Sequence, residues 1–288
     1  MLTTISPELR SVIENAAHTE SHLCWSCSSC DLECPINLAT SSLRPQKIVR
    51  LANLGCLNEL LSLPEIWYCL TCRRCNTVCP NLVKPATLIA YFREHAVLRS
   101  AVSYDASRNY QKFFMRFQRI RWHTADICLK GEIGPVSEEQ WHDWLETPVE
   151  KSAREISDKD IFPMSQDFRN AAGDSETASC LTCSECSGAC PVSCERSVFD
   201  PQWIFRMVNM GLARELLKSP AIWLCVGCGR CTEACSQLVK GHIMIQNLQK
   251  LALAEGFADR GFPMRLYEAQ KLIYPRLLKE IDRMFDFS

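Results

Sequence analysis

Several patterns that would mark a nucleotide-binding or membrane-bound protein are missing from this 288-residue sequence. It has no G-x-G-x-x-G motif after a strand and no G-x4-G-K-S/T motif, so no nucleotide site is visible. No apolar stretch approaches the roughly 18 residues that a membrane helix requires, and the N-terminus lacks the basic start and apolar run of a signal peptide. A formal net charge of −1 gives no sign of nucleic-acid binding. We therefore expect no direct membrane span and no nucleic-acid partner.

Alternating runs of β-branched residues, the pattern of half-buried strands, are nearly absent as well. Apolar residues recur at helical spacing instead, as in Ile48, Leu51 and Ala52. Asp200 before Pro201 is a favourable helix start, because aspartate caps free N–H groups and proline suits the first helical position. Gly55 stands where the end of a helix favours a positive φ. These patterns predict a mostly α fold.

Cysteine, in contrast, is abundant, with 19 residues. Sixteen of them form four copies of the motif C-x2-C-x2-C-x3-C, arranged in two pairs. The first pair is Cys24, Cys27, Cys30, Cys34 and Cys69, Cys72, Cys75, Cys79; the second is Cys180, Cys183, Cys186, Cys190 and Cys225, Cys228, Cys231, Cys235. This spacing is the ligand signature of a bacterial-type 4Fe–4S cluster. The sequence therefore predicts four 4Fe–4S clusters, with these sixteen cysteines as iron ligands, and no catalytic residue.

Two other uses of clustered cysteines fit this spacing less well. Structural zinc sites combine two C-x2-C pairs across a longer spacer, so a triple C-x2-C-x2-C run suits them poorly. Disulfide frameworks belong to short secreted chains without a sufficient core, whereas 47% of this chain is hydrophobic. A colourless protein would favour the zinc-bound scaffold.

The two motif pairs belong to an internal repeat. A shift of 156 positions aligns residues 24–84 with 180–240 without a gap, and 27 of the 61 aligned pairs are identical. The identical pairs reach beyond the cysteines and include Trp67 with Trp223. The repeat is therefore a duplicated domain and not a coincidence of cysteine spacing.

The motif with its following proline resembles that of two-cluster bacterial ferredoxins, in which the fourth cysteine ligates the other cluster. This resemblance implies that each cluster takes three cysteines from one motif and the fourth from the partner motif. The implied sets are Cys24, Cys27, Cys30 with Cys79; Cys69, Cys72, Cys75 with Cys34; Cys180, Cys183, Cys186 with Cys235; and Cys225, Cys228, Cys231 with Cys190. Such crossing would tie each pair of motifs into one folded unit.

The chain as a whole resembles the C subunit of heterodisulfide reductase, a member of the α-helical ferredoxin class. The resemblance rests on the paired motifs, on the connecting segment PQKIVRLANLGCLNELLSLPEIWYC and on its copy PQWIFRMVNMGLARELLKSPAIWLC. A tryptophan two residues before the second motif is typical of this family. The match covers residues 24–122 and 180–285, and the chain departs from the family in carrying two motif pairs instead of one.

The resemblance implies a mostly α fold of two tandem α-helical ferredoxin domains, each built around two 4Fe–4S clusters. The stretch 132–160 is acidic and contains two prolines, which is typical of a connector. We therefore predict a first two-cluster domain at 1–130, an acidic connector at 131–170 and a second two-cluster domain at 171–288.

The implied role is that of an electron-transfer subunit in a soluble heterodisulfide-reductase-like complex. It would relay single electrons between a flavin-containing partner of the A type and a catalytic partner of the B type, and would not be an enzyme on its own. An alternative is the iron–sulfur subunit of a quinone-linked dehydrogenase of the succinate dehydrogenase or glycolate oxidase type, although the plant-type or adjacent-cysteine domain that it would need is absent. Thiolates that must stay reduced favour a cytoplasmic location.

Three cysteines lie outside the motifs. Cys56 aligns with Leu212 and Cys194 with Leu38, so both are expected to be small apolar core residues, with ligand exchange as an alternative for Cys194. Cys128 is assigned no role.

Several other residues have two interpretations each. Trp67 and Trp223 are expected to pack over the clusters and exclude water, with a role as electron stepping stones as the alternative. Arg74 and Arg230 either raise the potential of a nearby cluster or are solvated. Segment 107–123 is either an amphipathic helix that packs on the first domain or a docking face for an acidic partner.

Overall fold

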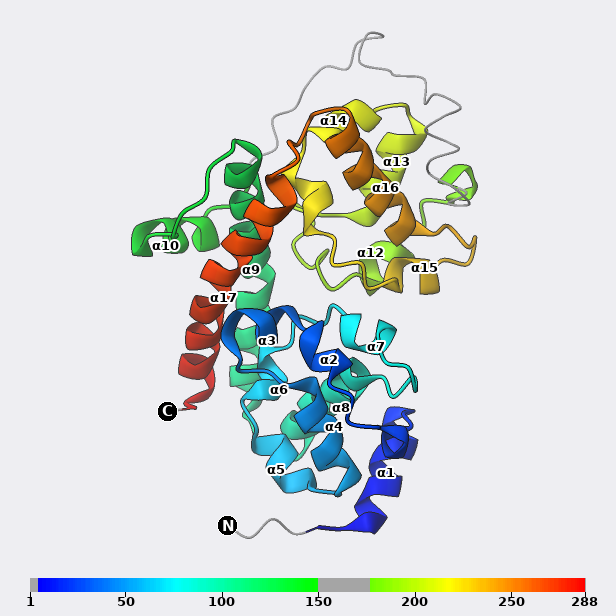
Figure 1. Cartoon of the computed structure of the whole chain (residues 1–288), viewed down its shortest axis with the longest axis vertical. Coiled ribbons are helices and arrows are strands. Elements are labelled where there is room, and N and C mark those ends of the chain that lie inside the picture. Colours follow the sequence, from blue (N-terminus) through cyan, green and yellow to red (C-terminus); the bar gives the residue numbers. More distant parts are fainter. Residues whose placement is uncertain (1–4, 150–176, 288) are drawn as a thin grey trace. The chain divides into compact units, whose positions relative to one another are not determined.

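The structure, a computed structural model, describes residues 5–149 and 177–287 (Figure 1). Helices joined by loops make up these two stretches, and no strand occurs in them. The mostly α fold expected from the sequence is therefore confirmed. No helix within the two stretches has the length and apolar content needed to cross a membrane.

Helical elements follow one another in a similar order in the two stretches. In 5–149 they are α1 (Pro7–Ala17), η1 (Ser21–Leu23), α2 (Ser29–Leu32), α3 (Pro35–Thr40), α4 (Pro45–Asn53), α5 (Leu57–Ser62), α6 (Glu65–Tyr68), α7 (Arg74–Thr77), α8 (Pro85–Leu98), α9 (Tyr104–Leu129) and α10 (Glu138–Glu146). In 177–287 they are η2 (Thr177–Ser179), α12 (Glu185–Ala189), α13 (Pro201–Asn209), α14 (Ala213–Leu217), η3 (Pro220–Leu224), α15 (Arg230–Glu233), α16 (Gly241–Ala254) and α17 (Phe262–Phe285). The elements labelled η are 3-10 helices.

The internal repeat is also visible in where the helices begin and end. Helices α4 and α13, α7 and α15, and α8 and α16 begin and end at residues 156 positions apart. Helix α3 has no helical counterpart, because residues 191–196 form bends and turns, and the counterpart of α1 falls outside the described residues. The duplicated part of each repeat is thus a frame of short helices around the cysteine motifs.

Proline and glycine mark the ends of the helix that follows each first motif. Pro45 and Pro201 occupy the first turn of α4 and α13, where a missing N–H costs no hydrogen bond. The Asp200 side chain accepts a hydrogen bond from the backbone N–H of Gln202, as expected for a helix cap. Gly55 follows α4 with φ of +68°, a left-handed conformation that glycine adopts without Cβ strain. The helix predicted around Ile48, Leu51 and Ala52, ahead of Gly55, is therefore confirmed.

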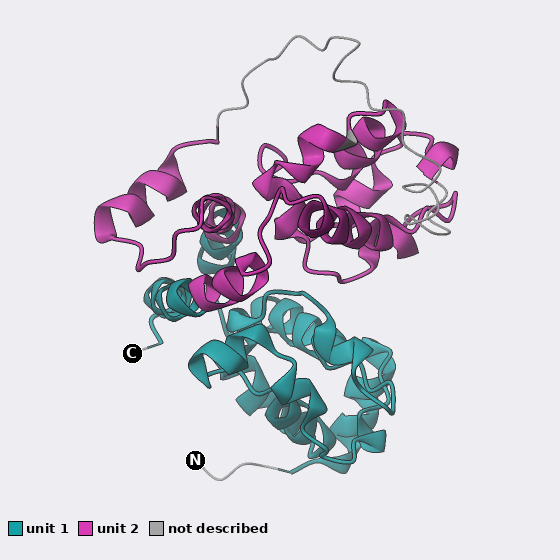
Figure 2. Cartoon of the chain, turned by 45° about the horizontal axis from the view of Figure 1, so that its top comes forward, with its two compact units in different colours: residues 1–112, 271–288 teal, residues 113–270 magenta. Residues whose placement is uncertain are grey.

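The chain forms two compact units (Figure 2). Unit 1 consists of residues 1–112 and 271–288, and unit 2 of residues 113–270. Both boundaries fall inside long helices, so α9 and α17 each contribute one part to each unit. These bounds differ from the continuous domains suggested by the sequence, because side chains near the end of α17 have their partners in unit 1.

The core of unit 1 is apolar and joins α4, α5, α6 and α8, which pack against one another. Ile48, Leu60, Ile66, Leu88 and Phe92 in these helices are completely buried. Burial of each such side chain stabilises the fold by about 1.5–3 kcal/mol. This core lies beneath the segments that carry the cysteines.

The last turns of α17 complete unit 1. Phe285 packs on Trp67 with ring centroids 4.3 Å apart, and Tyr110 of α9 meets the same indole at 5.2 Å. The hydroxyl of Tyr68 donates a hydrogen bond to Asp282. The C-terminal segment is therefore held at the chain that leads into the second cysteine motif.

The core of unit 2 joins α13, α14, η3 and α16 with the second part of α9. Ile222, Met244 and Leu248 are completely buried there, and Cys128 of α9 belongs to the same apolar cluster. Arg265 of α17 donates hydrogen bonds to the carbonyl oxygen of Cys128 at 3.0 and 3.2 Å. The helix that follows the first repeat in sequence thus completes the second unit.

Segment 107–123 lies within α9, as its amphipathic pattern predicts, but its second part packs differently from the expectation. Phe117 is buried in unit 2 and faces Trp141 of α10 with ring centroids 6.1 Å apart. Arg119 forms a salt bridge to Glu195 at 2.8 Å. The expected packing on the first domain is therefore wrong for this part of the helix, because its partners come from later in the chain.

The expected acidic connector is described in part. Helix α10 lies within it and begins with a capping box, in which Ser137 and Gln140 exchange hydrogen bonds. The connector from residue 150 onward lies outside the described residues.

Gly55→Ala tests the close approach between the start of α1 and the end of α4. A Cβ at position 55 would lie 1.9 Å from the backbone oxygen of Ser6, at a φ of +68°. We expect a loss of about 2 kcal/mol or more, because left-handed strain costs on the order of 1 kcal/mol and steric overlap adds to it. Thermal unfolding of the iron-loaded protein measures the effect. Gly134→Ala is the control, since a Cβ there meets nothing within 4 Å; equal midpoints for the two variants would contradict the close approach.

Candidate iron–sulfur sites

All four cysteine motifs share one backbone feature. The second and fourth residues after the first cysteine have a positive φ in every copy. These residues are Ser26, Ser28, Thr71, Arg73, Thr182, Ser184, Gly227 and Gly229, with φ between 54° and 76°. Six of them are not glycine, so they carry strain on the order of 1 kcal/mol each, of the kind that clusters at ligand clamps. In the sequence, the two glycines are the sole signal of this conformation.

This conformation makes each cysteine loop a candidate anion nest. Left-handed residues set between others turn successive backbone N–H groups toward one point, and such nests occur at many iron–sulfur sites. In one loop the N–H of Thr71 already donates to Sγ of Cys69 at 3.4 Å. A short helix follows each loop (α2, α7, α12 or α15) and carries the third cysteine. The loops therefore combine three thiols with N–H donors, which suits a negatively charged cluster.

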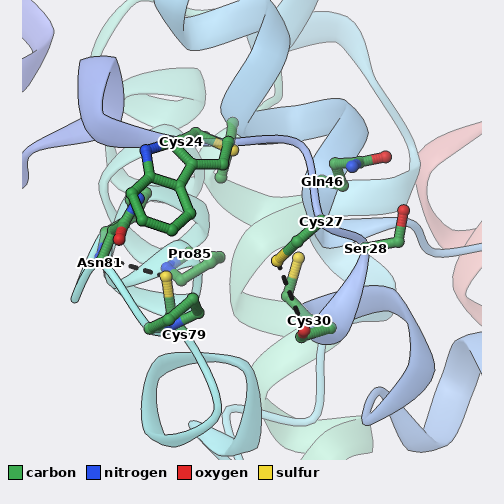
Figure 3. A pocket seen from close by; sticks show the side chains of 13 residues that line it. Cys24, Cys27, Ser28, Cys30, Gln46, Cys79, Asn81 and Pro85 are labelled. Carbon is green, nitrogen blue, oxygen red and sulfur yellow. Dashed lines mark hydrogen bonds between the residues drawn. The ribbon is translucent and has the colours of Figure 1, made fainter.

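In unit 1 the first three cysteines of the first motif share a cavity with the last cysteine of the second motif (Figure 3). Cys24, Cys27, Cys30 and Cys79 line this space, which measures about 380 Å³ including its open mouth. In the view of Figure 3, Cys27 and Cys30 lie on one side and Cys79 on the other. Cys27 is exposed, and its hydrogen bond with Ser29 lowers the pKa of the thiol.

Cys34, the last cysteine of the first motif, lines a second cavity. Cys69, Cys72 and Cys75 surround the same space, which measures about 330 Å³ including its mouth. Burial, together with negative charge on Cys69 and Cys72, raises the pKa of Cys34 to about 12. A buried thiol among other thiols gives up its proton when a metal replaces the proton as the positive partner.

The two cavities of unit 1 are close to each other. Burial is the main cause that raises the pKa of Cys75, and the thiols of its own cavity add to the effect. Cys30, from the first cavity, is a further cause. Helix α2, which carries Cys30, packs against α7, which carries Cys75. Groups held in the two cavities would therefore lie within electrostatic reach of each other.

Cys190 of unit 2 has surroundings like those of Cys34 in unit 1. Burial, together with negative charge on Cys228 and Cys225, raises the pKa of Cys190 to about 12. The last cysteine of the first motif therefore again lies beside the thiols of the second motif. Helices α12 and α15, which follow the two loops, pack against each other.

The remaining thiols of unit 2 lie near these. Burial raises the pKa of Cys231 to about 12, and the further causes include Cys186 of the first motif. Cys180 and Cys235 pack against the apolar core of unit 2, and Cys183 is exposed. The thiols of the two motifs therefore lie within electrostatic reach of each other, as they do in unit 1.

The motif thiols are not arranged to bind a single metal ion. Within residues 5–149 and 177–287, no three side chains of Cys, His, Asp or Glu are placed to hold a single metal ion. All 19 cysteines are free thiols. A 4Fe–4S cube needs a thiolate at each of its four iron corners, so it requires four thiols around a space of its own size. The two cavities of unit 1, each lined by four thiols, fit that requirement.

Trp67 and Trp223 are buried, as expected, yet Trp67 lines neither of the two cavities of unit 1. Each indole instead packs on an aromatic ring of α17, and Trp223 meets Phe262 at 4.4 Å. Their role in excluding water from a cluster stays a prediction. Arg74, in the second motif, lies 3.7 Å from Glu33.

The three cysteines outside the motifs differ in how deeply they are buried. Cys56 is 3% exposed, so the expectation of a core residue is confirmed, and Cys128 is 1% exposed. Cys194 is half-buried and directs its thiol at the carbonyl oxygen of Pro191, at 3.4 Å.

Sequence reasoning did not place three charged residues beside the motifs, although one of them, Arg121, belongs to the basic segment 107–123 described above. Asp31, Arg93 and Arg121 contact backbone groups that lie 15, 24 and 103 positions away in sequence. The folded chain brings these partners together, so no local pattern marks them. The one available signal was the position of Asp31 directly after Cys30.

Comparison with known families finds the 4Fe–4S dicluster domain twice in this chain, at residues 20–83 and 176–239. Each matched stretch contains one complete pair of motifs. The matches repeat at the 156-residue offset of the internal repeat.

Among curated proteins, the C subunit of the H(2):CoB-CoM heterodisulfide,ferredoxin reductase of Methanothermobacter thermautotrophicus is 36% identical over 99 residues, which is 34% of this chain and 50% of the relative. The second iron-sulfur C subunit of the CoB--CoM heterodisulfide reductase of Methanocaldococcus jannaschii is 27% identical over 139 residues, which is 48% of this chain and 67% of the relative. The corresponding C subunit of Methanopyrus kandleri is 32% identical over 85 residues, which is 30% of this chain and 44% of the relative. The chain spans about half the length of the curated relatives it matches.

Each dicluster domain holds two 4Fe–4S clusters, so two domains account for the four motifs and give four clusters in all. The predicted cofactors and the resemblance seen in the motifs are therefore confirmed. The chain therefore contains the 4Fe–4S dicluster domain twice in tandem, and part of it is similar in sequence to the C subunit of heterodisulfide reductase.

Proposed function

We propose that this chain is the electron-transfer subunit of a heterodisulfide-reductase-like complex. It relays single electrons through its four 4Fe–4S clusters, between a flavin-containing partner of the A type and a catalytic partner of the B type. The observation that carries the proposal is the fourfold recurrence of one left-handed cysteine loop, in a chain whose matched relatives are named as C subunits. One-electron transfer is the chemistry that such clusters supply in proteins.

The proposed ligand sets are the crossed ones, in which each loop receives its fourth thiol from the partner motif. In unit 1 the two cavities support this assignment, since each is lined by one complete set. In unit 2 the closeness of Cys190 to Cys225 and Cys228 supports it. Crossed sets place two clusters next to each other, which favours electron exchange within a unit.

The chemistry that consumes the electrons belongs to a partner in this proposal. The sixteen motif thiols are taken up by the clusters in this proposal. The matched relatives are named as subunits of reductases. We place the complex in the cytoplasm, where thiols stay reduced until iron binds them.

Iron analysis tests the proposed cluster count. Four cubes hold four iron atoms each, so the anaerobically reconstituted chain should contain about 16 iron atoms and as many sulfides. Cys56→Ala is the control and should retain the full content, because Cys56 lies outside the motifs. A content of about 8 iron atoms or fewer in wild-type protein would rule out the four-cluster relay.

Serine variants test the crossing of ligands. We expect Cys79→Ser to perturb the same EPR signal as Cys27→Ser, because both residues line the first cavity of unit 1. Cys34→Ser should perturb the same signal as Cys72→Ser, since these two line the second cavity. If Cys79→Ser instead matches Cys72→Ser, each cluster is held by a single motif and the crossed sets are wrong.

Native purification identifies the partners. Anaerobic isolation of the tagged chain from its own cells should bring down a flavoprotein and a second iron–sulfur protein that reduces a disulfide or a related acceptor. Copurification with a membrane anchor and quinone-dependent activity would favour the quinone-linked dehydrogenase instead.

A further inference from the structure

A buried carboxylate lies beside the first cysteine loop of unit 1. Asp31 follows Cys30 in α2, is 4% exposed, and has its Oδ1 atom 3.9 Å from Sγ of Cys30. The same oxygen accepts a hydrogen bond from the backbone N–H of Gln46 at 2.8 Å, and Oδ2 accepts one from Nε of Arg44 at 3.0 Å. These bonds hold the negative charge against the loop.

Unit 2 has a carboxylate at the corresponding loop, but it comes from another sequence position. Ser187 stands where the repeat would place a copy of Asp31, and its hydroxyl donates a hydrogen bond to Asp200. Ser187 directly follows Cys186, the third cysteine of this loop, so this hydrogen bond holds Asp200 next to the loop. The carboxylate is therefore present beside the first loop of both units.

A guanidinium lies at the second cysteine loop of unit 1. Arg93 of α8 donates hydrogen bonds to the carbonyl oxygens of Ile66, Trp67 and Cys69, at 2.6, 3.0 and 2.6 Å. Its guanidinium carbon also lies 5.8 Å from the Trp67 ring centroid. No carboxylate lies within salt-bridge distance of Arg93 in the described part of the chain. Its positive charge therefore acts on the backbone of the loop without a neutralising partner.

In unit 2 the residue at the position of Arg93 is Gln249, and the guanidinium comes instead from Arg121 of α9. Arg121 is 8% exposed and donates a hydrogen bond at 3.0 Å to the carbonyl oxygen of Leu224, the residue directly before Cys225. The duplication has thus kept a cation at the entry to the second loop while changing the residue that supplies it.

Arg121 forms no ion pair with a carboxylate within residues 5–149 and 177–287. Its guanidinium donates to Gln118 Oε1 at 2.8 Å, which is neutral, and its Nε finds no hydrogen-bond partner among the described residues. A buried cation without an anion destabilises the fold. A 4Fe–4S cluster with four thiolate ligands is an anion and lies at the loop that Arg121 approaches, provided that the proposed ligand sets hold.

We propose that these charges polarise each unit, so that the cluster of its second loop is reduced at a higher potential than the cluster of its first loop. Reduction adds one negative charge to a cluster, which a nearby carboxylate disfavours and a nearby guanidinium favours. One electron then leaves the first-loop cluster, which is oxidised, and enters the second-loop cluster, which is reduced. No bond is broken and no proton is transferred. The inference rests on the proposed function and its ligand sets.

Arg44 and Asp282 in unit 1 oppose this polarity and act more weakly. Arg44 pairs with Asp31, but the Arg44 side chain is 58% exposed and that of Asp31 is 6% exposed, so water screens the cation more strongly. Asp282 accepts its hydrogen bond from the hydroxyl at the far end of Tyr68, whereas Arg93 bonds the backbone of the loop itself. The closer and better buried charges, those of Asp31 and Arg93, therefore determine which of the two clusters has the higher reduction potential.

A redox titration of the iron-loaded chain, followed by EPR, tests the polarity, with serine variants of the motifs identifying each signal. Arg93→Gln installs the residue that unit 2 has at this position. We expect it to shift the reduction equilibrium of the second-loop cluster of unit 1 about tenfold toward the oxidised form, which is about 59 mV for one electron. Arg93→Lys keeps the charge and should stay near the wild-type potential. Asp31→Asn should shift the first-loop cluster toward the reduced form.

Arg99→Gln is the charge-matched control, since it removes an exposed cation at the end of the same helix. The polarity is refuted if Arg93→Gln shifts the potential no more than this control, or if Arg93→Lys falls as far as Arg93→Gln. Should Arg93→Gln not take up iron, Arg121→Gln provides the same test in unit 2, with the same expected shift. Two clusters or fewer in the wild-type chain would refute the proposed function, whereas four clusters with unshifted potentials refute the polarity alone.

Discussion

The meeting of two cysteine loops within each repeat is the constraint on which the rest of the structure depends. Three thiols of one loop leave one iron corner of a cube without a ligand, and in the proposed ligand sets the fourth thiol comes from the partner motif. In unit 1 the contact of α2 with α7 brings a fourth thiol to each of two cavities, and α12 meets α15 in unit 2. The frame of α4, α5 and α8 then holds the two loops at a fixed separation, and this frame recurs 156 residues later.

Local features of the structure could be predicted from the sequence, and long-range ones could not. Pro45 and Gly55 bound a helix because each acts on its own backbone, and the cysteine spacing specifies the cluster type for the same reason. The left-handed conformation of Arg73 has no such local signal, because the loop as a whole imposes it. The division of α17 between two units depends on contacts such as that of Tyr68 with Asp282, 214 positions apart in the chain.

Comparison of the two repeats distinguishes what the duplication keeps as residues from what it keeps as physical properties. The sixteen cysteines and the loop conformation are kept as such. The charges beside the loops are kept in sign while the residues change, with Asp200 in the role of Asp31 and Arg121 in the role of Arg93. A purely structural role as a helix cap or a donor to a carbonyl does not require a charge at these positions, because a neutral acceptor or donor would suffice. An electron-transfer role does, because the charge near a cluster sets the ease of its reduction.

A crystal structure of the iron-loaded chain with anomalous scattering recorded at the iron edge tests the central claim most directly. The account predicts four compact iron peaks, two in each unit, each bounded by three thiols of one motif and by the last thiol of its partner motif. Peaks bounded by four thiols of a single motif, or isolated single ions, would contradict it.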